Sequence, residues 1–517
     1  MDRREFLKLV ALSGLAWKLG AGRNLAFGGD LPPNAFAGKW LGDDFRAGHV
    51  LRDRELPKFS DAEAMPEADV LVIGGGISGL VAARALARSG RTVRVLEQAD
   101  VPGGNAKSAE WGGIQYSIGA AYFCAPEKDS PLETLYREIG ILERAKKVPK
   151  GEVFLGGKLV EDIWEGKTDP ENAEATRALR ETWRRIYEER YPAVPWSEDC
   201  GWSKDEFEKL DRKPFSDYLG EIKAPPHVRT FCDHYCWSSF GGRSSEISTW
   251  CALNFLTAEF GDILALPGGN AAIARALAAS LDPKVAPIDT GAFVAEIKQT
   301  DAGVVAHAIC GDKPRRYAAK AAVVAVPRYV ASRIIAGFPQ ERVDLAKAMK
   351  YRAYIVANVL LSKRPSHEWY DAYSLEALDP GTCGWTDLVL ADFVAEAKTD
   401  RCVLTAYRGL PFDDGRKLLL VDQDLAHFAK PVRDGLVPLL AGLGMKESDI
   451  VDINLARWGH PLVLSSPGQL SGGAMEKLSA PLGRIAFAQQ DRFGIPAIEN
   501  AIEAANLAVE EIEEILK

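Results

Sequence analysis

Residues 68–100 read ADVLVIGGGISGLVAARALARSGRTVRVLEQAD, and this stretch decides the fold. Its apolar start, VLVI, is typical of a buried parallel strand. Gly74, Gly76 and Gly79 follow with GxGxxG spacing, and the chain then continues as a helix. The first glycine permits a tight turn, the second lets the backbone approach a pyrophosphate, and the third lets the helix pack on the strand. We therefore expect a dinucleotide whose phosphates lie on the helix N-terminus, beside Ile77 and Ser78.

A second expected strand, TVRVLE, ends in Glu97, and Gln98 follows it. An acid at this position is placed to accept hydrogen bonds from an adenosine ribose. A glycine-rich turn without function is the alternative. The strand before the turn, the helix after it and the acid beyond them disfavour that interpretation.

The residues beyond Glu97 distinguish between dinucleotides, because EQADVPGGNAKS places a second pair of glycines close to the acid. This segment resembles the second glycine signature of the flavin amine oxidase superfamily, Arg-x-Gly-Gly-Arg-x-x-Ser/Thr. Val101 and Asn105 stand in place of the arginines, and Ser108 is retained. The superfamily also includes protoporphyrinogen oxidases and phytoene-type desaturases. The resemblance implies FAD as the cofactor, held in part by Gly103, Gly104, Asn105 and Ala106.

Later segments carry the same resemblance over nearly all of the chain. LALPGGNAAIARALA matches the family's Pro-x-Gly-Gly segment, and the backbone of Val294 is implied to meet the adenine. The C-terminal signature F-A-G-x-E/D appears as FAQQD, in which Asp491 is the acid. The resemblance implies that Asp491 contacts a ribityl hydroxyl, whereas a helix cap on the surface is the alternative. Ala497 and the backbone of Ile498 would face the pyrimidine end of the ring, where the helix dipole stabilises negative charge.

The substrate side departs from the family pattern. Many amine oxidases place an aromatic pair beside the flavin and a lysine near its reactive nitrogen. Here Ala497 stands at one aromatic position, and Asn358 is the polar residue in the segment where the lysine is expected. Trp458 and His460 are the nearest catalytic candidates. A histidine can titrate near neutral pH, although a structural role for His460 is an equal alternative.

The segment 231–255 is dense in polar and aromatic residues. Cys232 and Cys236 lie one helical turn apart, and we favour two buried thiols over a disulfide. No cysteine lies near the C-terminal signature, so the FAD is expected to be non-covalent, and no metal site is expected. The larger side chains of the segment either line a pocket or belong to the core, and they are His234, Tyr235, Trp237 and Trp250.

The chain has 517 residues, 47% of them hydrophobic, and is long enough for more than one core. The resemblance implies an α/β fold with a discontinuous, Rossmann-like FAD-binding domain of the GR2 type and an inserted α+β substrate-binding domain. The expected parts are a signal peptide (1–37), a linker or arm (38–67), FAD-binding parts (68–150, 261–340 and 456–517) and substrate-binding parts (151–260 and 341–455).

The N-terminus, MDRREFLK, has the paired arginines and the Phe-Leu-Lys that are typical of a twin-arginine export signal. NAFAG offers a cleavage site that ends at Ala37. An ordinary basic amphipathic helix is the alternative. We expect a bacterial periplasmic protein that has no transmembrane segment in its mature form. The formal net charge of -9 argues against a nucleic-acid partner.

These observations together predict an FAD-dependent oxidoreductase that transfers a hydride from an organic substrate to the flavin. Amines or polyamines are the first substrate class by resemblance, with dioxygen or a respiratory acceptor as the oxidant. A carbon–carbon desaturase or isomerase of the phytoene desaturase or protoporphyrinogen oxidase type is the second possibility. A non-catalytic flavoprotein that binds a protein partner is the third. The sequence leaves the substrate, the electron acceptor and the oligomeric state open.

Overall fold

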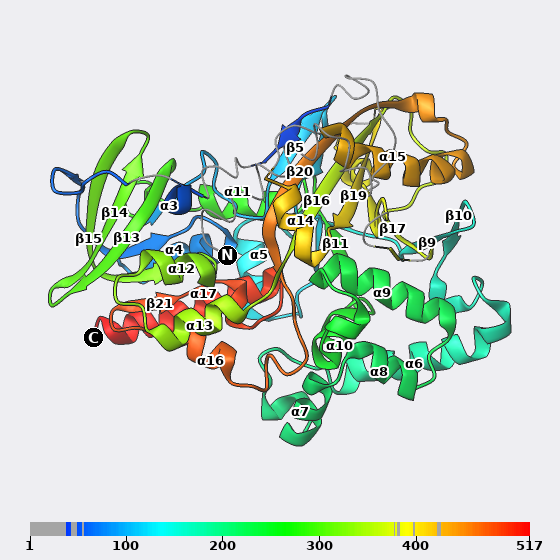
Figure 1. Ribbon diagram of the computed structural model, residues 1–517, viewed down its shortest axis with the longest axis horizontal. Coiled ribbons are helices and arrows are strands. Elements are labelled where there is room, and N and C mark those ends of the chain that lie inside the picture. Colours follow the sequence, from blue (N-terminus) through cyan, green and yellow to red (C-terminus); the bar gives the residue numbers. More distant parts are fainter. Residues whose placement is uncertain are drawn as a thin grey trace, which may run out of the picture.

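The computed structural model describes residues 38–42, 49–53, 56–376, 378–379, 383–396, 399–420 and 425–517. The expected signal peptide and its cleavage site lie outside these residues. Figure 1 shows two β-sheets beside each other, with α17 below the first sheet and the helices α6 to α10 below the second. The combination of parallel strands with covering helices confirms the expected α/β fold.

The first sheet is built around β3, the strand that precedes the glycines. β3 pairs in parallel with β4 and with the second half of β15. The first half of β15 pairs with β14 in an antiparallel hairpin, and β13 follows. β12 pairs with β4, while β2 and β21 pair with β15. The strands are β2 (Glu63–Ala64), β3 (Ala68–Ile73), β4 (Val93–Leu96), β12 (Ile288–Asp289), β13 (Ala292–Thr300), β14 (Gly303–Cys310), β15 (Lys313–Val324) and β21 (Ile485–Phe487).

Both faces of this sheet are buried. Val70 and Val72 pack against a layer of helices on one face. Leu71 and Ile73 pack on the other face, against the β13–β15 strands and a further helix. Burial on both faces explains why β3 is a continuous apolar run rather than an alternating one. The helices of the first face are α4 (Ile77–Arg88), α11 (Ala271–Ala279) and α17 (Ile498–Ile515), and α12 (Arg328–Ile334) lies on the second.

The second sheet has the order β1-β20-β16-β19-β18-β17-β9-β10 and is mostly antiparallel. The helix α15 (Leu425–Gly442) packs on one face of it through Phe428, Val432 and Leu436. The other face packs against Ile114, Tyr116 and Ala121. The strands are β1 (Trp40–Leu41), β9 (Glu152–Leu155), β10 (Lys158–Glu161), β16 (Tyr351–Leu361), β17 (Asp371–Ser374), β18 (Asp387–Leu390), β19 (Cys402–Gly409) and β20 (Ile450–Val463).

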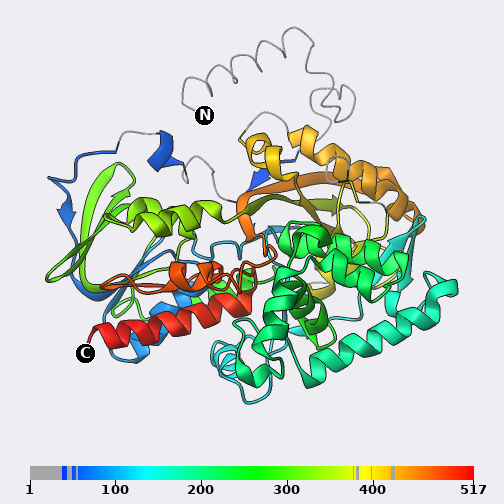
Figure 2. The same cartoon turned by 60° about the horizontal axis from the view of Figure 1, so that its bottom comes forward.

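A helical region completes the fold and lies at the lower right in Figure 2. Its core contains Trp183, Phe215 and Leu253, all of them buried. The helices of this region are α6 (Ala173–Glu189), α7 (Lys204–Arg212), α8 (Phe215–Glu221), α9 (Pro226–Phe240) and α10 (Thr249–Ala258). No helix in the described part of the chain has the length and apolar character needed to cross a membrane.

One expected domain boundary has to move. The division between residues 455 and 456 falls inside β20, which runs unbroken from Ile450 to Val463. β20 pairs with β16 over this whole length, from the Leu361–Ile450 pair to the Tyr351–Val463 pair. Its second half therefore belongs to the second sheet, and the last cofactor-side part of the chain begins after it.

The expected arm contacts both sheets. β1 pairs in parallel with β20, and β2 pairs in parallel with β15 of the first sheet. The Trp40 ring packs edge-on against Phe428, with a distance of 5.8 Å between the ring centroids. The guanidinium of Arg457 lies 4.6 Å from the centre of the Trp40 ring. Between these strands, the short helix α3 (Val50–Asp53) follows His49.

Candidate functional site

A cavity of about 1970 Å³ is lined by residues of both sheets and of the helices α9 and α10. Both catalytic candidates, Trp458 and His460, line it, whereas Gly79 and Asp491 are not part of its lining. The other residues expected to hold the cofactor all line this one cavity, and they are Gly74, Gly76, Ile77, Ser78, Glu97, Gln98, Gly103, Gly104, Asn105, Ala106, Val294, Ala497 and Ile498.

The two glycine segments meet beside the start of α4. The N–H of Gly103 donates to the carbonyl oxygen of Gly75 at 2.8 Å, and Gly76 and Gly103 form a β-bridge. Gly104 has a φ of +59°, and a Cβ on it would lie 3.2 Å from Cα of Gly76. The two glycine segments thus cross at close range, because neither has a side chain at the crossing point. They leave a wall of bare backbone that suits a pyrophosphate.

Gly79 has the packing role that the sequence predicts. A Cβ at this position would lie 1.9 Å from the carbonyl oxygen of Gly74, so glycine is required for α4 to approach the turn. Gly76 occupies the N-cap of α4 and brings no side chain to cover the helix end. The first N–H groups of α4 are therefore open to an anionic ligand in the cavity.

Glu97 completes this end of the cavity. Its Oε2 accepts the N–H of Gly75 at 2.6 Å, and its Oε1 accepts the N–H of Ala99 at 2.8 Å. Val294, expected near the adenine, lines the cavity together with Ala292 and Phe293 at the start of β13. The bare glycine wall, the open helix end and the acid expected to bind the ribose fit the pyrophosphate and adenosine of FAD.

Asp491, which is expected to contact a ribityl hydroxyl, is not part of the cavity lining. It is fully buried behind the cavity wall, and the hydroxyl of Tyr351 donates a hydrogen bond to its Oδ2. The backbone N–H of Asp491 donates to Oε1 of Gln489 at 2.6 Å. The chain turns here in a short 3-10 helix, Gln490–Arg492, which places the acid inside the protein. Gln489 and Gln490 line the cavity instead.

Trp458 and His460 both lie on β20. The indole N–H of Trp458 donates to the carbonyl oxygen of Ile118 at 2.7 Å. Nε2 of His460 accepts a hydrogen bond from Arg416 at 3.1 Å. Burial, reinforced by the positive charge of Arg416, lowers the pKa of His460 to about 3. The imidazole is therefore neutral near pH 7, which corrects the expectation that His460 titrates there.

The N-terminus of α17 also opens on the cavity. Pro496, Ala497, Ile498 and Glu499 line it, and Ala497 forms the N-cap without a polar side chain. The positive end of the helix dipole thus faces the space where the sequence places the pyrimidine end of the flavin. Glu499 accepts the backbone N–H of Cys124 at 3.1 Å, and burial raises its pKa.

The second sheet contributes a row of tyrosines and one carboxylate to the wall of the cavity. Asp387 in β18 is paired directly with Tyr407 in β19 and with Tyr373 in β17, so these side chains share one face of the sheet. The hydroxyl of Tyr407 donates to the carbonyl oxygen of Gly119 at 2.8 Å. Gly119 adjoins Ile118, which accepts the hydrogen bond from Trp458, so the row is connected to Trp458 through this segment.

Helices α9 and α10 form the opposite wall. The hydroxyl of Tyr235 donates to Oε1 of Glu259 at 3.0 Å, and the hydroxyl of Ser238 donates to Oδ1 of Asp387 at 2.5 Å. Burial raises the pKa of Glu259 to about 8 and that of Asp387 to about 7. We call this region the tyrosine chamber, and the residues that define it are Tyr122, Tyr235, Ser238, Glu259, Tyr354, Asp387 and Tyr407, all of which line the cavity.

The remaining aromatic candidates of residues 231–255 are core residues. His234 is fully buried, and its Nε2 bonds the carbonyl oxygen of Glu376 at 2.7 Å. Trp250 is fully buried and donates to the carbonyl oxygen of Ala193 at 3.0 Å. Trp237 is buried beneath the guanidinium of Arg352. The pocket interpretation therefore holds for Tyr235 and not for these three.

Two further expectations concern polar residues in the interior. Cys232 and Cys236 are both buried and both free, so the interpretation as buried thiols is confirmed. Asn358, the polar residue in the expected lysine segment, is fully buried in β16. Its Oδ1 accepts a hydrogen bond from Thr405 at 2.9 Å, so it is held by the neighbouring strand.

The sequence did not identify the carboxylates of the tyrosine chamber. Asp387 stands in TDLVL, an otherwise apolar strand, and an acid in such a strand was the available signal. Glu259 ends a helix and resembles any surface acid in the sequence. Only the packing of α9 and α10 against the second sheet brings the two carboxylates to the same cavity.

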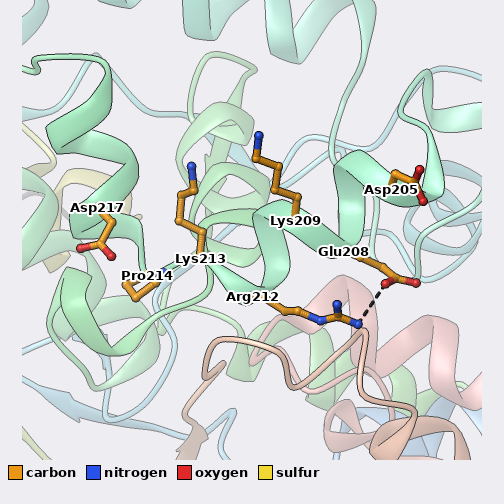
Figure 3. Close-up of a pocket in the computed structure, with 7 residues that line it drawn as sticks. All are labelled: Asp205, Glu208, Lys209, Arg212, Lys213, Pro214 and Asp217. Carbon is orange, nitrogen blue, oxygen red and sulfur yellow. Dashed lines mark hydrogen bonds and ion pairs between the residues drawn. The ribbon is translucent and has the colours of Figure 1, made fainter.

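A second pocket, of about 600 Å³, lies on α7 and the start of α8, and Figure 3 shows its charged lining. Arg212 pairs with Glu208 at 2.9 Å, and Lys213 pairs with Glu221. None of the residues expected to hold the cofactor is part of this lining. Charges of both signs on one helix face are typical of a solvated surface, so the large cavity remains the candidate active site.

The chain is similar to known proteins over most of its length. A family model described as flavin containing amine oxidoreductase matches residues 77–512. The chain is 25% identical to oxidoreductase PigB of Serratia sp. (strain ATCC 39006), over 85% of this chain and 75% of that protein. It is 25% identical to putrescine oxidase of Kocuria rosea, over 87% of this chain and 96% of that protein. A solved structure of putrescine oxidase bound to putrescine superposes with a TM-score of 0.68 at 17% identity, covering 87% of this chain and all of that one.

Proposed function

Because the chain belongs to the family of flavin-containing amine oxidoreductases and is an FAD-dependent oxidoreductase, we propose that it oxidises an amine. The reaction removes a hydride from the carbon beside the nitrogen and leaves a C=N bond. The observation that carries this proposal is one continuous cavity, which runs from the FAD-binding residues to the tyrosine chamber. Glu259 and Asp387 line that chamber and give it two carboxyl groups that can bind the amino group of a substrate.

When bound, FAD supplies the acceptor for the hydride and its two electrons. The protein's own residues orient the substrate and exclude water. Tyr354 and Tyr407 supply aromatic wall, and the N-terminus of α17 at Ile498 directs its positive dipole end into the cavity. A developing negative charge near that helix end is stabilised by backbone groups that need no reorganisation.

The expected alternative of a carbon–carbon desaturase or isomerase makes a different demand on the cavity. A hydrocarbon substrate would cover Asp387 and Glu259 without offering a hydrogen bond or a positive charge. Burying carboxylates beneath an apolar ligand is unfavourable. The chamber therefore favours amine oxidation over oxidation of a hydrocarbon chain.

Anaerobic mixing of the purified holoprotein with a panel of amines tests this function. At least one amine should bleach the visible absorbance of the flavin, and the alcohol of the same carbon skeleton should not. Bleaching by none of the amines, together with formation of a double bond in a polyene or fatty acid, would assign the protein to the desaturase class.

We also infer export through the twin-arginine route, supported by the sequence around Arg3 and Arg4. A protein that takes up FAD before export suits a route that moves folded proteins. Replacing both arginines with lysine should retain the protein in the cytoplasm of a bacterial host, whereas the unaltered chain reaches the periplasm. Equal distribution of both forms would contradict export by this route. Dioxygen or a respiratory acceptor then reoxidises the flavin, and stopped-flow reoxidation by each distinguishes them.

A further inference from the structure

The N-terminal arm contributes side chains to the same cavity as the cofactor segments. His49, Leu51 and Arg52, which belong to α3 and the residue before it, are part of the cavity lining. The family model matches the chain only from residue 77 onward, so these side chains lie outside the matched region. We propose that Leu51 and Arg52 form part of the FAD site and slow the release of the cofactor.

The described parts of the arm are attached to both sheets. Trp40 and Leu41 form β1 and pair with Leu455 and Ala456 of the second sheet. Further along the arm, β2 pairs with β15 of the first sheet. α3 lies between these two attachments in the chain, and Figure 1 shows it above α12, between the strands β13–β15 and the second sheet. The two attachments therefore hold α3 at the cavity.

Leu51 places α3 at the adenosine end of the cavity. Its side chain packs against the apolar cluster that contains Ile73, Leu96 and Val294. These three residues also line the cavity. Ile73 ends the strand before the first glycine, and Leu96 directly precedes Glu97. Leu51 thus extends the apolar wall at the place where the sequence predicts the adenosine of FAD.

The arm contacts the opposite side of the cavity through Gly42. A Cβ on Gly42 would lie 3.6 Å from Cδ1 of Ile118 and 4.0 Å from Cζ2 of Trp458. Trp458 lines the cavity and belongs to β20 of the second sheet. The arm therefore touches the cavity wall at the second sheet as well as at the first.

Arg52 brings a positive charge to a cavity that is expected to hold a pyrophosphate. Its Nη2 donates a hydrogen bond to Nδ1 of His49 at 3.2 Å, which holds the guanidinium beside the imidazole. The second glycine segment supplies no arginine itself, since Val101 and Asn105 stand where the signature that it resembles has arginines. A guanidinium is well suited to bind phosphate oxygens. The arm thus supplies charge that the glycine segment lacks.

A site that is partly walled by the arm releases its ligand more slowly than an open one, because contacts with the arm must break before the ligand leaves. The arm directly follows the expected signal peptide. FAD held in this way suits a protein that is expected to be exported with its cofactor bound.

The same substitution at two leucines of the arm tests the role of Leu51. Leu51→Ala should raise the rate of FAD release about fivefold or more, because apolar wall is lost at the adenosine. Leu56→Ala is the matched control, since Leu56 is described, exposed and not part of the cavity lining. The rise in flavin fluorescence after dilution of the holoprotein measures the rate. Equal rates for the two variants would overturn the proposal.

Salt dependence separates a charge contact of Arg52 from a packing effect. Arg52→Gln should release FAD about threefold faster than the wild type at low salt. The difference should disappear at about 1 M salt, where charges are screened within about 3 Å. Lys58→Gln, at an exposed position of the arm, should match the wild type at both salt concentrations. A wild-type rate for Arg52→Gln at low salt, or a difference that salt does not reduce, would contradict the assignment of Arg52.

Hydrogen exchange on the unaltered protein covers the case in which a variant does not fold. The backbone amides of residues 49–52 should exchange more slowly with FAD bound than after its removal, while residues 56–60 of the same arm should exchange alike in both forms. Equal exchange of residues 49–52 in the two forms would overturn the proposal. None of these measurements needs a substrate, so a panel of amines that leaves the flavin oxidised would refute the proposed function and not this one.

Discussion

The hydroxyl of Tyr351 donates a hydrogen bond to Oδ2 of Asp491, in a site where the carboxylate has no exposed surface. Arg328 is also fully buried, and its positive charge opposes the rise in the pKa of Asp491 that burial causes. Asp491 thus links the start of β16 to the segment before α17 through a hydrogen bond. Among the described residues its Oδ2 is bonded to Tyr351 and its Oδ1 has no hydrogen-bond partner.

Asp491→Ala should therefore destabilise the fold before it weakens cofactor binding. Removing the carboxylate leaves the Tyr351 hydroxyl and the buried Arg328 uncompensated, at a cost of about 2–4 kcal/mol. Chemical denaturation of the FAD-free protein measures this loss. Asp344→Ala, at an exposed position of Gln340–Ala348, should change stability very little. A variant that loses FAD while its apoprotein keeps wild-type stability would restore the ribityl assignment.

Gly79→Ala should weaken FAD retention. The new Cβ would lie 1.9 Å from the carbonyl oxygen of Gly74, and the turn that faces the pyrophosphate must move. Overpacking of this kind costs about 1–3 kcal/mol, so FAD affinity should fall about tenfold or more. The ratio of flavin to protein absorbance after gel filtration measures occupancy. Gly220→Ala in α8 meets nothing within 4 Å and should retain full occupancy.

His460→Gln should leave the shape of the pH–rate profile unchanged. Burial and the positive charge of Arg416 hold the pKa of His460 at about 3, so the wild-type imidazole is already neutral across the assay range. Glutamine can still accept the hydrogen bond from Arg416, and only a modest loss of kcat is expected. Disappearance of a limb of the profile near neutral pH would show that His460 titrates during turnover.

The ligand-free protein should lose stability as pH rises from about 4 to about 8. The folded pKa of Asp387 is about 7 and that of Glu259 about 8, above their ordinary values of 3.8 and 4.5. The folded state therefore keeps protons that the unfolded state has released, and unfolding becomes more favourable with pH in this window. The groups that face these acids are Asp371, Tyr122, Tyr235, Ser238, Tyr354, Tyr373 and Tyr407.

A Tm series across that window checks the prediction. Between pH about 4 and pH about 8, the Tm of the Asp387→Asn/Glu259→Gln double variant should fall by less than the Tm of the wild type. Asp371, whose pKa burial raises to about 7, stays in both proteins, so the slope should shrink without vanishing. Parallel curves for the two proteins would show that the acids do not hold protons in the folded state.

The cofactor side of the site was predictable because its residues form contiguous patterns. A strand, three glycines, a helix and Glu97 follow one another within thirty-odd residues, and each spacing has a local physical reason. The meeting of Gly76 with Gly103 also follows from chain order, since the second glycine pair comes directly after the second strand. Such short-range geometry needs no knowledge of the rest of the fold.

The substrate side could not be predicted in the same way. Strand pairing joins Asp387 and Tyr407, and the packing of α10 brings Glu259 to them from more than a hundred residues earlier in the chain. The side chain of Asp491 could not be placed for a related reason. Its position matches the family signature, but the direction of its side chain depends on Tyr351 in a strand far away in the chain. Motif spacing gives the place of a residue, and tertiary packing gives its direction.

The two-residue strand β1 lies along the outer edge of β20, at the border of the second sheet. An edge strand with free backbone groups is a template for adding another chain, and short covering segments prevent this. Trp40 anchors the cover on Phe428. Proteolytic trimming past residue 41 would then uncover the edge of β20 at Leu455 and Ala456. The trimmed protein would gain a tendency to self-associate, so the few residues beside the expected cleavage point act as a safeguard of solubility as well as a connection.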